Sequence, residues 1–325
     1  MITFIDLFAG IGGFRIALEK CGCQCVFSSE IDIHCQKVYF NNFGEKSFGD
    51  ITKIDENTIP AFDILCAGIP CQPFSICGKK QGFEDTRGTL FWDVCRIIKA
   101  KSPKVILIEN VKHLINHNKK QTIKTMISSL EELGYFVSYE ILNAKDFGVP
   151  QNRERVFIIG IKNKKFDFSN VRKRIPIFLK DILDIKGNFE YLDKNDYTLI
   201  DNKYVHMQPT GLLFIGYRNK NIWKKGVREN TLYLSRVHRQ PNRIYSIDGV
   251  HPTIPSQEVS GRFWIYLPNE DMVRKLTVSE CYKLFGFPQN FIRDTNISRQ
   301  YRQIGNSVVI PVIYELVQSI IRQVF

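Results

Sequence analysis

The chain has 325 residues, of which 44% are hydrophobic and 24% charged, an ordinary balance for a protein with one large core or a core and a smaller domain. This composition excludes a disordered or low-complexity chain. The formal net charge is +12, and all of the excess lies after residue 150: residues 1–150 carry 17 basic and 17 acidic side chains, residues 151–325 carry 28 and 16. The two parts are therefore expected to have different partners.

The ends and the cysteines indicate the compartment. The apolar start Met1–Leu7 has no basic region before it, and no run of about 18 uninterrupted apolar residues follows, so neither a signal peptide nor a membrane span is expected. Nine cysteines, an odd number, favour reduced thiols in a cytoplasmic protein. The spacing of Cys21, Cys23 and Cys25, with His34 nearby, favours buried small residues over zinc ligands, so no metal is expected.

Over the first half of the chain, apolar runs of strand length alternate with segments of helical period. The runs are Ile2–Leu7, Phe14–Lys20, Cys25–Ser28, Phe62–Ala67, Leu90–Ile98, Val105–Glu109, Thr122–Leu133, Phe136–Leu142 and Val156–Ile161. The alternation predicts an α/β sheet built from βαβ units. Because no helix-length segment separates the last two strands, we expect them to pair as an antiparallel, hairpin-like unit at a mixed sheet edge.

The regular alternation stops at about Phe178, and a region rich in short strands, aromatic residues and basic residues follows. We therefore expect a catalytic and cofactor-binding domain at residues 1–177 and a small separate domain at 178–272. Residues 273–325 should return to the first domain, with helices at Val278–Phe285 and Val308–Val324. Between Arg218 and Arg243 stand eight basic residues and one acid, a pattern that suits a phosphate backbone, although a solvated basic surface would have the same composition.

A glycine-rich turn, Phe8–Gly13, follows the first strand and opens a helix, so its backbone can approach a ligand closely. Glu30, at the end of the second strand, can accept hydrogen bonds from ribose hydroxyls, and Asp50 can hold an adenine amino group. These parts suit any cofactor that contains a nucleoside, NAD included.

The segment Gly68–Ser75 follows the strand Phe62–Ala67 and places Cys71 between Pro70 and Pro73. Prolines on both sides would aim the cysteine rigidly from the carboxyl end of the strand into the ligand crevice of the sheet. Glu109, with Asn110 and Val111, closes another strand on the same rim, and residues 151–155 open a later one.

At these residues the sequence resembles the cytosine-5 DNA methyltransferases, especially the bacterial modification enzymes of restriction systems. The match spans nearly the whole chain, and seven motifs stand in family order. They are Asp6–Phe14, Gly68–Ser75, Arg87–Asp93, Glu109–Val111, Gln151–Ile161, Arg274–Pro288 and Tyr301–Val309.

The resemblance implies a Rossmann-like α/β fold: an S-adenosylmethionine-dependent methyltransferase sheet with helices on both faces, plus a smaller, irregular, β-rich target-recognition domain. It also implies methyl transfer from S-adenosylmethionine to carbon 5 of a flipped cytosine, leaving S-adenosylhomocysteine. Cys71 is the expected nucleophile and Glu109 the expected acid at ring nitrogen 3, while Arg155 holds the base and Arg153 belongs to the same catalytic motif. Neither a metal nor ATP is required.

The cofactor contacts that the resemblance implies surround the glycine turn and the strand ends. They are Phe8, Ala9, Gly10, Ile11, Gly12, Gly13, Glu30, Ile31, Asp50, Ile51, Gly68, Pro70, Leu90, Asn306 and Ser307. Many relatives carry an aromatic residue where this chain has Ile31, so the adenine contact there is expected to be looser. The segment Ser75–Arg87 matches the mobile loop that closes over DNA.

For DNA, the resemblance and the basic stretch select side chains in two regions. The candidates are Ser75, Arg87, Arg228, Arg239, Arg243, Thr253, Gln257 and Arg262. Arginine in the major groove most naturally reads guanine and glutamine reads adenine, but a phosphate contact or a structural role remains open for each.

Two other functions share parts of this pattern. A tRNA cytosine-5 methyltransferase would use the same catalytic residues, but its Cys-Phe-Thr signature is absent here. A non-catalytic DNA-binding regulator would need an added amino-terminal segment, and a Rossmann dehydrogenase would leave Cys71, Glu109 and Arg155 without roles. The expected partner is double-stranded DNA, read as a site of roughly four to six base pairs by a monomer in the bacterial cytoplasm. No membrane and no stable complex with a cognate endonuclease are expected.

Overall fold

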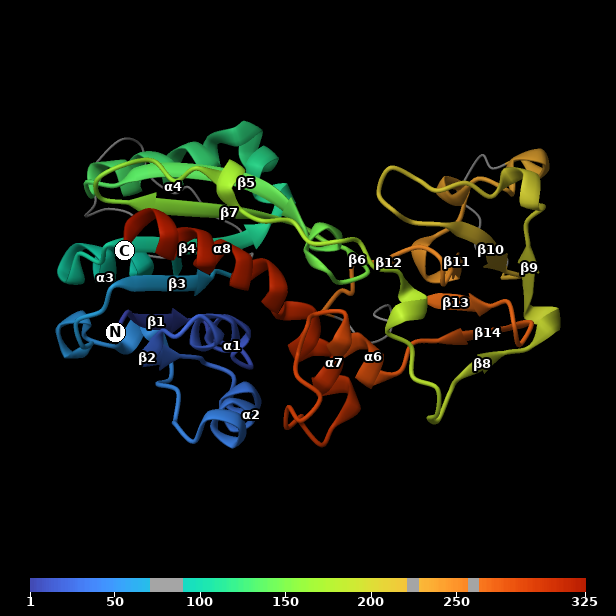
Figure 1. The fold of residues 1–325 in the computed structure, drawn as a ribbon, viewed down its shortest axis with the longest axis horizontal. Helices are drawn as coiled ribbons and strands as arrows, with labels where there is room; N and C mark the ends of the chain where they lie inside the picture. Colours follow the sequence, from blue (N-terminus) through green and yellow to red (C-terminus); the bar gives the residue numbers. More distant parts are fainter. Residues whose placement is uncertain (71–89, 221–227, 257–262) are drawn as a thin grey trace. The chain divides into compact units, whose positions relative to one another are not determined.

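The computed structural model describes residues 1–70, 90–220, 228–256 and 263–325. The chain divides into two compact units (Figure 1). The first unit consists of Met1–Leu142, Glu154–Arg172 and Ser307–Phe325, and the second of Asn143–Arg153 and Lys173–Asn306. The second unit thus extends beyond the expected interval 178–272 on both sides, because residues 143–153 and 273–306 pack with it.

A six-stranded mixed sheet forms the centre of the first unit. In spatial order its strands are β2 (Gln24–Ser29), β1 (Thr3–Leu7), β3 (Ile64–Gly68), β4 (Val105–Val111), β7 (Glu154–Ile161) and β5 (Phe136–Asn143). The pairs β1–β2, β1–β3 and β3–β4 are parallel, whereas β4–β7 is antiparallel. The predicted α/β class with a mixed edge is confirmed, and β7 and β5 are neighbours as expected.

Within the described residues, five helices belong to this unit: α1 (Gly13–Lys20), α2 (Ile33–Phe43), α3 (Leu90–Lys101), α4 (Gln121–Glu132) and α8 (Ile310–Val324). Helix α1 packs against α8. Helix α2 was not predicted, although its boundary signals are present: the Asp32 side chain accepts hydrogen bonds from the amides of His34 and Cys35, and Gly44 ends the helix at φ 72°. Short 3-10 turns are η1 (Ile51–Lys53), η2 (Glu56–Thr58), η3 (Lys112–Lys120) and η5 (Phe168–Asn170).

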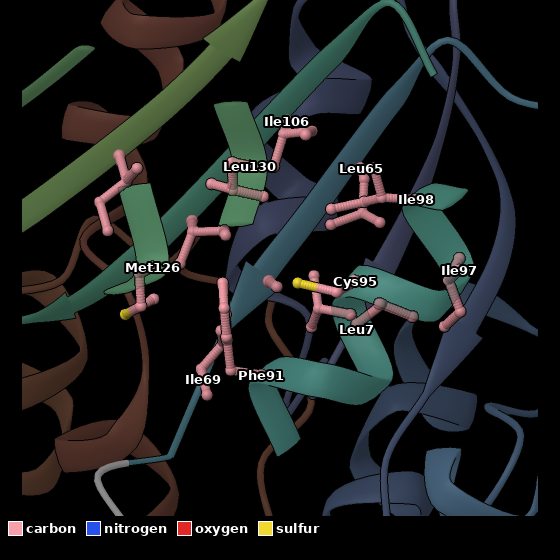
Figure 2. Close-up of a cluster of buried hydrophobic side chains, with 14 of the residues drawn as sticks. Leu7, Leu65, Ile69, Phe91, Cys95, Ile97, Ile98, Ile106, Met126 and Leu130 are labelled. Atoms are coloured by element: carbon pink, nitrogen blue, oxygen red, sulfur yellow. The ribbon is translucent and has the colours of Figure 1, made fainter. Parts of the chain in front are cut away.

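The main core of the first unit lies where α3 and α4 meet one face of the sheet (Figure 2). Phe91 and Cys95 of α3 and Met126 of α4 are at most 1% exposed, and they pack with Leu65 and Ile106 of the strands. Burial of this continuous apolar layer holds the strand ends that carry the site residues, since fully burying one such side chain stabilises a fold by about 1.5–3 kcal/mol.

The second unit is built on another six-stranded sheet and one two-stranded pair. The large sheet has the order β8 (Tyr191–Leu192), β14 (Met272–Lys275), β13 (Trp264–Leu267), β11 (Arg243–Ser246), β10 (Phe214–Arg218) and β9 (Tyr197–Leu199). The small pair is β6 (Gln151–Asn152) with β12 (His251–Pro252), and the α-helices of the described part of this unit are α6 (Val278–Lys283) and α7 (Ile297–Asn306). The 3-10 turns are η4 (Ala144–Phe147), η6 (Leu179–Asp181), η7 (Lys194–Asp196), η8 (Asn202–Tyr204), η9 (Glu229–Thr231), η10 (Ser235–Val237) and η11 (Gln240–Asn242).

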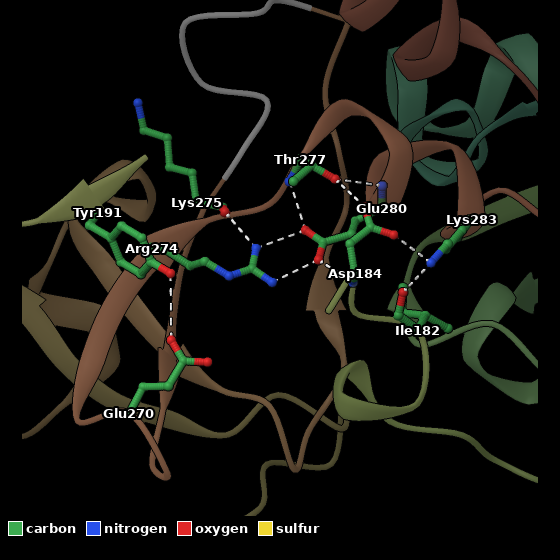
Figure 3. A network of polar contacts seen from close by, with 9 residues as sticks. All are labelled: Ile182, Asp184, Tyr191, Glu270, Arg274, Lys275, Thr277, Glu280 and Lys283. Carbon is green, nitrogen blue, oxygen red and sulfur yellow. Dashed lines mark hydrogen bonds and ion pairs between the residues drawn. The ribbon is translucent and has the colours of Figure 1, made fainter. Parts of the chain in front are cut away.

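A buried ion pair secures α6 to the sheet of the second unit (Figure 3). Arg274 of β14 donates to both carboxylate oxygens of Glu280, at 2.9 and 2.7 Å, and both side chains are at most 2% exposed. Glu280 also accepts from the amide of Thr277 as part of a capping box at the start of α6. Lys283 and Thr277 both bond to Asp184, which extends the network to the loop before β8.

Within the described residues, one stretch, Ile297–Val324, is long and apolar enough by length and composition to cross a membrane, although polar residues interrupt its apolar ones. Of its most apolar 18 residues, 67% are buried inside the fold. The stretch contains α7 and α8 with a break between them, and packing within the fold accounts for its apolar side chains.

Candidate active site

The glycine-rich turn Phe8–Gly13 joins β1 to α1 through three left-handed residues: Phe8 at φ 58°, Gly10 at 54° and Gly12 at 87°. Such angles cost a residue with a side chain about 1 kcal/mol or more, so Gly10 and Gly12 suit their places and Phe8 is strained. At Gly13 an added Cβ would lie 2.7 Å from Ser307 Oγ. The turn therefore brings the start of α1 against the chain that leads into α8.

Glu30 is fixed beside this turn. Its Oε2 accepts a hydrogen bond from the Gly10 amide at 2.8 Å and its Oε1 accepts one from the Asp32 amide at 2.8 Å. Burial raises the pKa of Glu30 above its usual value, and the two amides oppose that shift. The Glu30 carboxylate is thus held next to the glycine turn, and its contact with a ribose stays a prediction.

The three residues expected near adenine have different surroundings. Asp50 is the N-cap of η1 and accepts from the hydroxyl and amide of Thr52, and these bonds lower its pKa, so it is ionised at neutral pH. Ile31 is 68% exposed, whereas Ile51 is 3% exposed and packs in the main core. Ile31 is thus the open apolar side chain of this group.

Glu109 and Arg155 form an ion pair at the carboxyl end of β4. Arg155 Nε lies 3.1 Å from Glu109 Oε1, and the two side chains are 17% and 12% exposed. Sheet pairing sets this geometry, because Glu109 stands opposite Gly68 of the parallel strand β3 while Arg155 stands opposite Val111 in the antiparallel pair β4–β7. Two predicted catalytic residues far apart in sequence therefore come together.

Asn110 supports the segment of chain that leads to the predicted nucleophile. The sequence predicted it only as the neighbour of Glu109. It is 2% exposed, and its Nδ2 donates to the carbonyl of Ile69 at 3.1 Å. Because Ile69 precedes Cys71 by two positions, this bond fixes the chain just before the cysteine. A signal for the role was present, since Asn110 directly follows the candidate acid at a strand end.

Several predicted residues lie outside the described part of the chain. They are Cys71, Ser75, Arg87, Gln257 and Arg262, together with the predicted loop Ser75–Arg87. Of the other cofactor candidates, Ala9 and Ile11 are buried in the turn, Leu90 begins α3, Gly68 ends β3, and Pro70 and Asn306 are exposed.

The remaining DNA candidates fall into two groups. Arg228 and Arg239 are exposed and open to a ligand. Arg243 donates through Nε and Nη2 to the carbonyl of His238, at 3.1 and 2.9 Å, and Thr253 Oγ1 donates to the carbonyl of Asn152 at 2.7 Å. The side chains of Arg243 and Thr253 thus bond to backbone carbonyls of the protein itself.

Arg153, predicted together with Arg155, lies in the second unit and is 3% exposed. Its guanidinium donates to the carbonyls of Ile254 and Gly305, and it lies over the ring of Phe285. The structure therefore brings Arg155, but not Arg153, to Glu109.

The model of the C-5 cytosine-specific DNA methylase family matches residues 2–322. The chain belongs to this family. It is 40% identical to the type II methyltransferase M.HhaI of Haemophilus parahaemolyticus, over 98% of this chain and 94% of that protein. It is 42% identical to the type II methyltransferase M.HpaII of Haemophilus parainfluenzae, over 96% of this chain and 87% of that protein.

Solved structures agree on the fold. The Dnmt2 methyltransferase of S. pombe superposes with a TM-score of 0.69 at 19% identity, covering 99% of both chains. The Entamoeba histolytica methyltransferase EhMeth gives a TM-score of 0.69 at 19% identity, covering 100% of this chain and 99% of the other. These likenesses show the methyltransferase fold.

Membership in the family makes this protein a DNA cytosine-5 methyltransferase, which acts on DNA and requires a methyl donor. Among the described residues, the seven cysteines are all free thiols, and no group of three or more His, Cys, Asp or Glu side chains is arranged to hold a metal ion. Burial raises the pKa of Cys25 to about 12 and that of Cys66 well above its ordinary value, so these thiols are neutral and unreactive.

Proposed function

We propose that the protein transfers a methyl group from S-adenosylmethionine to carbon 5 of a flipped cytosine within a short duplex site, as the modification enzyme of a bacterial restriction system. The observation that carries this proposal is the Glu109–Arg155 ion pair at 3.1 Å, one strand away from the end of β3 that leads to Cys71. A carboxyl group and a guanidinium held together beside a cysteine-bearing loop suit the polar edge of a cytosine ring.

The chemistry follows from the weak nucleophilicity of carbon 5. The Cys71 thiolate adds to carbon 6, Glu109 supplies a proton to ring nitrogen 3, and Arg155 holds both Glu109 and the carbonyl oxygen of the base. The resulting enamine uses its electron pair to form the new bond from carbon 5 to the methyl group, whose bond to the sulfonium sulfur breaks. Water then removes the proton from carbon 5, the returning electron pair expels the Cys71 thiolate, and ring nitrogen 3 returns its proton to Glu109.

The residues of the glycine turn fit S-adenosylmethionine, which supplies the electrophilic methyl group when bound. Glu30 is fixed for the ribose, the ionised Asp50 is available for the adenine amino group, and the exposed Ile31 is available for the adenine ring. The close approach of Gly13 to Ser307 supports a place for Asn306 and Ser307 beside the methionine moiety.

We assign target recognition to the second unit, where the exposed residues Arg228 and Arg239 are free to meet phosphates. The enzyme would act as a monomer on host DNA in the bacterial cytoplasm, with any cognate endonuclease working separately.

Bisulfite sequencing of plasmid DNA from cells that express the protein tests activity and site together. We expect full protection of one cytosine within one short sequence, and no protection in cells that express Cys71→Ser. The matched control is Cys21→Ser, which changes a half-buried thiol directly after the end of α1 and should keep the pattern. In vitro, labelled methyl transfer to duplex DNA but not to tRNA is expected, and transfer to tRNA alone would refute the proposal.

A further inference from the structure

Arg153 is a buried cation that binds two separate segments of the second unit. Its Nη1 donates to the carbonyl of Ile254 at 3.1 Å, its Nη2 donates to the carbonyl of Gly305 at 2.9 Å, and its guanidinium carbon lies 4.8 Å from the centre of the Phe285 ring. A guanidinium that is 3% exposed costs free energy unless such partners compensate for lost water. Arg153 and its contacts to Ile254, Gly305 and Phe285 are called the clamp below.

The first clamped segment is residues 251–256, which lead directly into Gln257, a candidate base contact. Residues on either side of the clamp hold this segment along its length: His251 pairs with Gln151 and Pro252 with Asn152 in the β12–β6 ladder. Thr253 donates to the carbonyl of Asn152, and the Gln151 side chain donates to the carbonyl of Leu284. Residues 251–256 are called the recognition segment below.

The second clamped segment is the end of α7. An added Cβ at Gly305 would lie 2.2 Å from the carbonyl oxygen of Pro255 and 2.6 Å from Ser256 Cα, so α7 touches the recognition segment backbone to backbone. From Gly305 the chain continues through Asn306 to Ser307. In the first unit, Ser307 Oγ lies 2.7 Å from the position of a Cβ on Gly13 of the cofactor turn.

We propose that Arg153 is a positioning residue which couples DNA recognition to cofactor binding, and this inference rests on the proposed function. Arg153 locks the recognition segment to Gly305, and only two residues further along the chain Ser307 packs on the cofactor turn. DNA that orders the recognition segment therefore also fixes Asn306 and Ser307, so cofactor binds more tightly to the DNA complex than to the free protein. By reciprocity, cofactor tightens DNA binding by the same factor.

The shape of the side chain explains why arginine stands here. A planar fork can donate to two carbonyls in different directions while its face lies on an aromatic ring, and a lysine ammonium cannot do all three. Both terminal nitrogens of Arg153 are already bonded to main-chain carbonyls, so the side chain does not reach a flipped base. Arg155, two residues later, carries the contact to Glu109 instead.

The test measures the affinity for S-adenosylhomocysteine by titration calorimetry, without DNA and with saturating duplex DNA of mixed sequence. We expect the wild-type affinity to rise at least fivefold with DNA. In Arg153→Lys the affinity without DNA should stay within twofold, while the gain with DNA falls below twofold. The KM for cofactor in methylation should rise, and kcat should change by less than threefold.

Arg155→Lys is the matched control, because it removes the contact to Glu109 and should lower kcat while leaving the coupling intact. Gly305→Ala perturbs the clamp from its other side, and should remove the gain with DNA even if Arg153→Lys does not fold. The double variant Arg153→Lys/Gly305→Ala should lose no more of the gain in cofactor affinity with DNA than either single variant. Wild-type protein without a gain, or folded variants that keep it, would overturn the proposal. Because binding needs no turnover, inactivity on DNA would refute the proposed function separately.

Discussion

Asp6 offers a direct test of the electrostatics of the first unit. It lies on β1 opposite Ser28 of β2 and Cys66 of β3, and its side chain is 0% exposed. Within the described residues, neither carboxylate oxygen has a hydrogen-bond partner of good geometry. Burial raises the pKa of Asp6 to about 8, and Arg15 opposes this shift only in part. The carboxyl group is therefore protonated in the native protein at neutral pH.

Linkage gives the sign and the size of the effect. A carboxyl group whose pKa is raised on folding binds its proton more tightly in the native state, so its contribution to stability is complete below pH 4 and is lost as the pH rises toward 8. The loss is about 1.4 kcal/mol per pH unit, so a rise from 3.8 to about 8 corresponds to an upper limit of about 6 kcal/mol. Asp6→Asn, which has the same shape and no charge, should remove this slope.

The assay is urea unfolding of wild type and Asp6→Asn at each pH from 5 to 9. The stability of the variant relative to wild type should increase steadily with pH and level off above about 8. Titrating groups that do not interact with Asp6 are present in both proteins and cancel in the difference. Glu132→Gln, on the exposed face of α4, serves as the control and should leave the wild-type slope unchanged. A stability difference that does not vary with pH would refute the buried, neutral carboxyl group.

Three further predictions concern the site and the second unit. Glu109→Gln should lower the single-turnover methylation rate by 100-fold or more, the usual loss on removing a general acid, while DNA affinity in a filter-binding assay changes little. Gly13→Ala would place a methyl group 2.7 Å from Ser307 Oγ and should weaken S-adenosylhomocysteine binding about tenfold in calorimetry, about 1.4 kcal/mol. Burial lowers the pKa of His251, which donates from Nδ1 to the carbonyl of Pro252, to about 4. Because a neutral buried histidine must be charged on acidification, up to about 3 kcal/mol should be lost as the pH falls from 6.5 to 4, and in His251→Gln this loss should disappear from acid unfolding curves.

Much of the fold could be predicted because its periodic signals are strong. The segment Thr122–Leu133 was expected from its apolar period and is α4 (Gln121–Glu132). Helix α7 was not predicted, because it overlaps the motif Tyr301–Val309, and a family motif does not by itself indicate a helix. The pairing order of the strands after β4 could be predicted only in part: sequence separation indicated that β5 and β7 are neighbours, but only packing places β7 directly beside β4.

The site shows the same division. That the residues at the ends of β1, β2 and β4 lie at one edge of the sheet could be predicted, because the carboxyl ends of parallel strands meet there. The contacts of the second unit could not, since they depend on backbone carbonyls, which leave no mark in a sequence. Arg243, predicted to contact a base or a phosphate, donates to the carbonyl of His238, whose ring stacks on Tyr217 at 4.2 Å. Its contact with DNA stays a prediction.

Arg153 and Arg155 illustrate why motif identity does not settle the role of a residue. They have the same chemistry and stand two positions apart, which on a continuous strand would place both side chains on one face. Strand β7 begins at Glu154, however, so Arg155 lies within the ladder opposite Val111, where it can reach Glu109. Arg153 precedes the strand, and its amide donates to the side chain of Asn143. Arg155 therefore pairs with Glu109 in the first unit, whereas Arg153 bonds to main-chain carbonyls of the second. The backbone path, and not the motif, decides which arginine makes which contact.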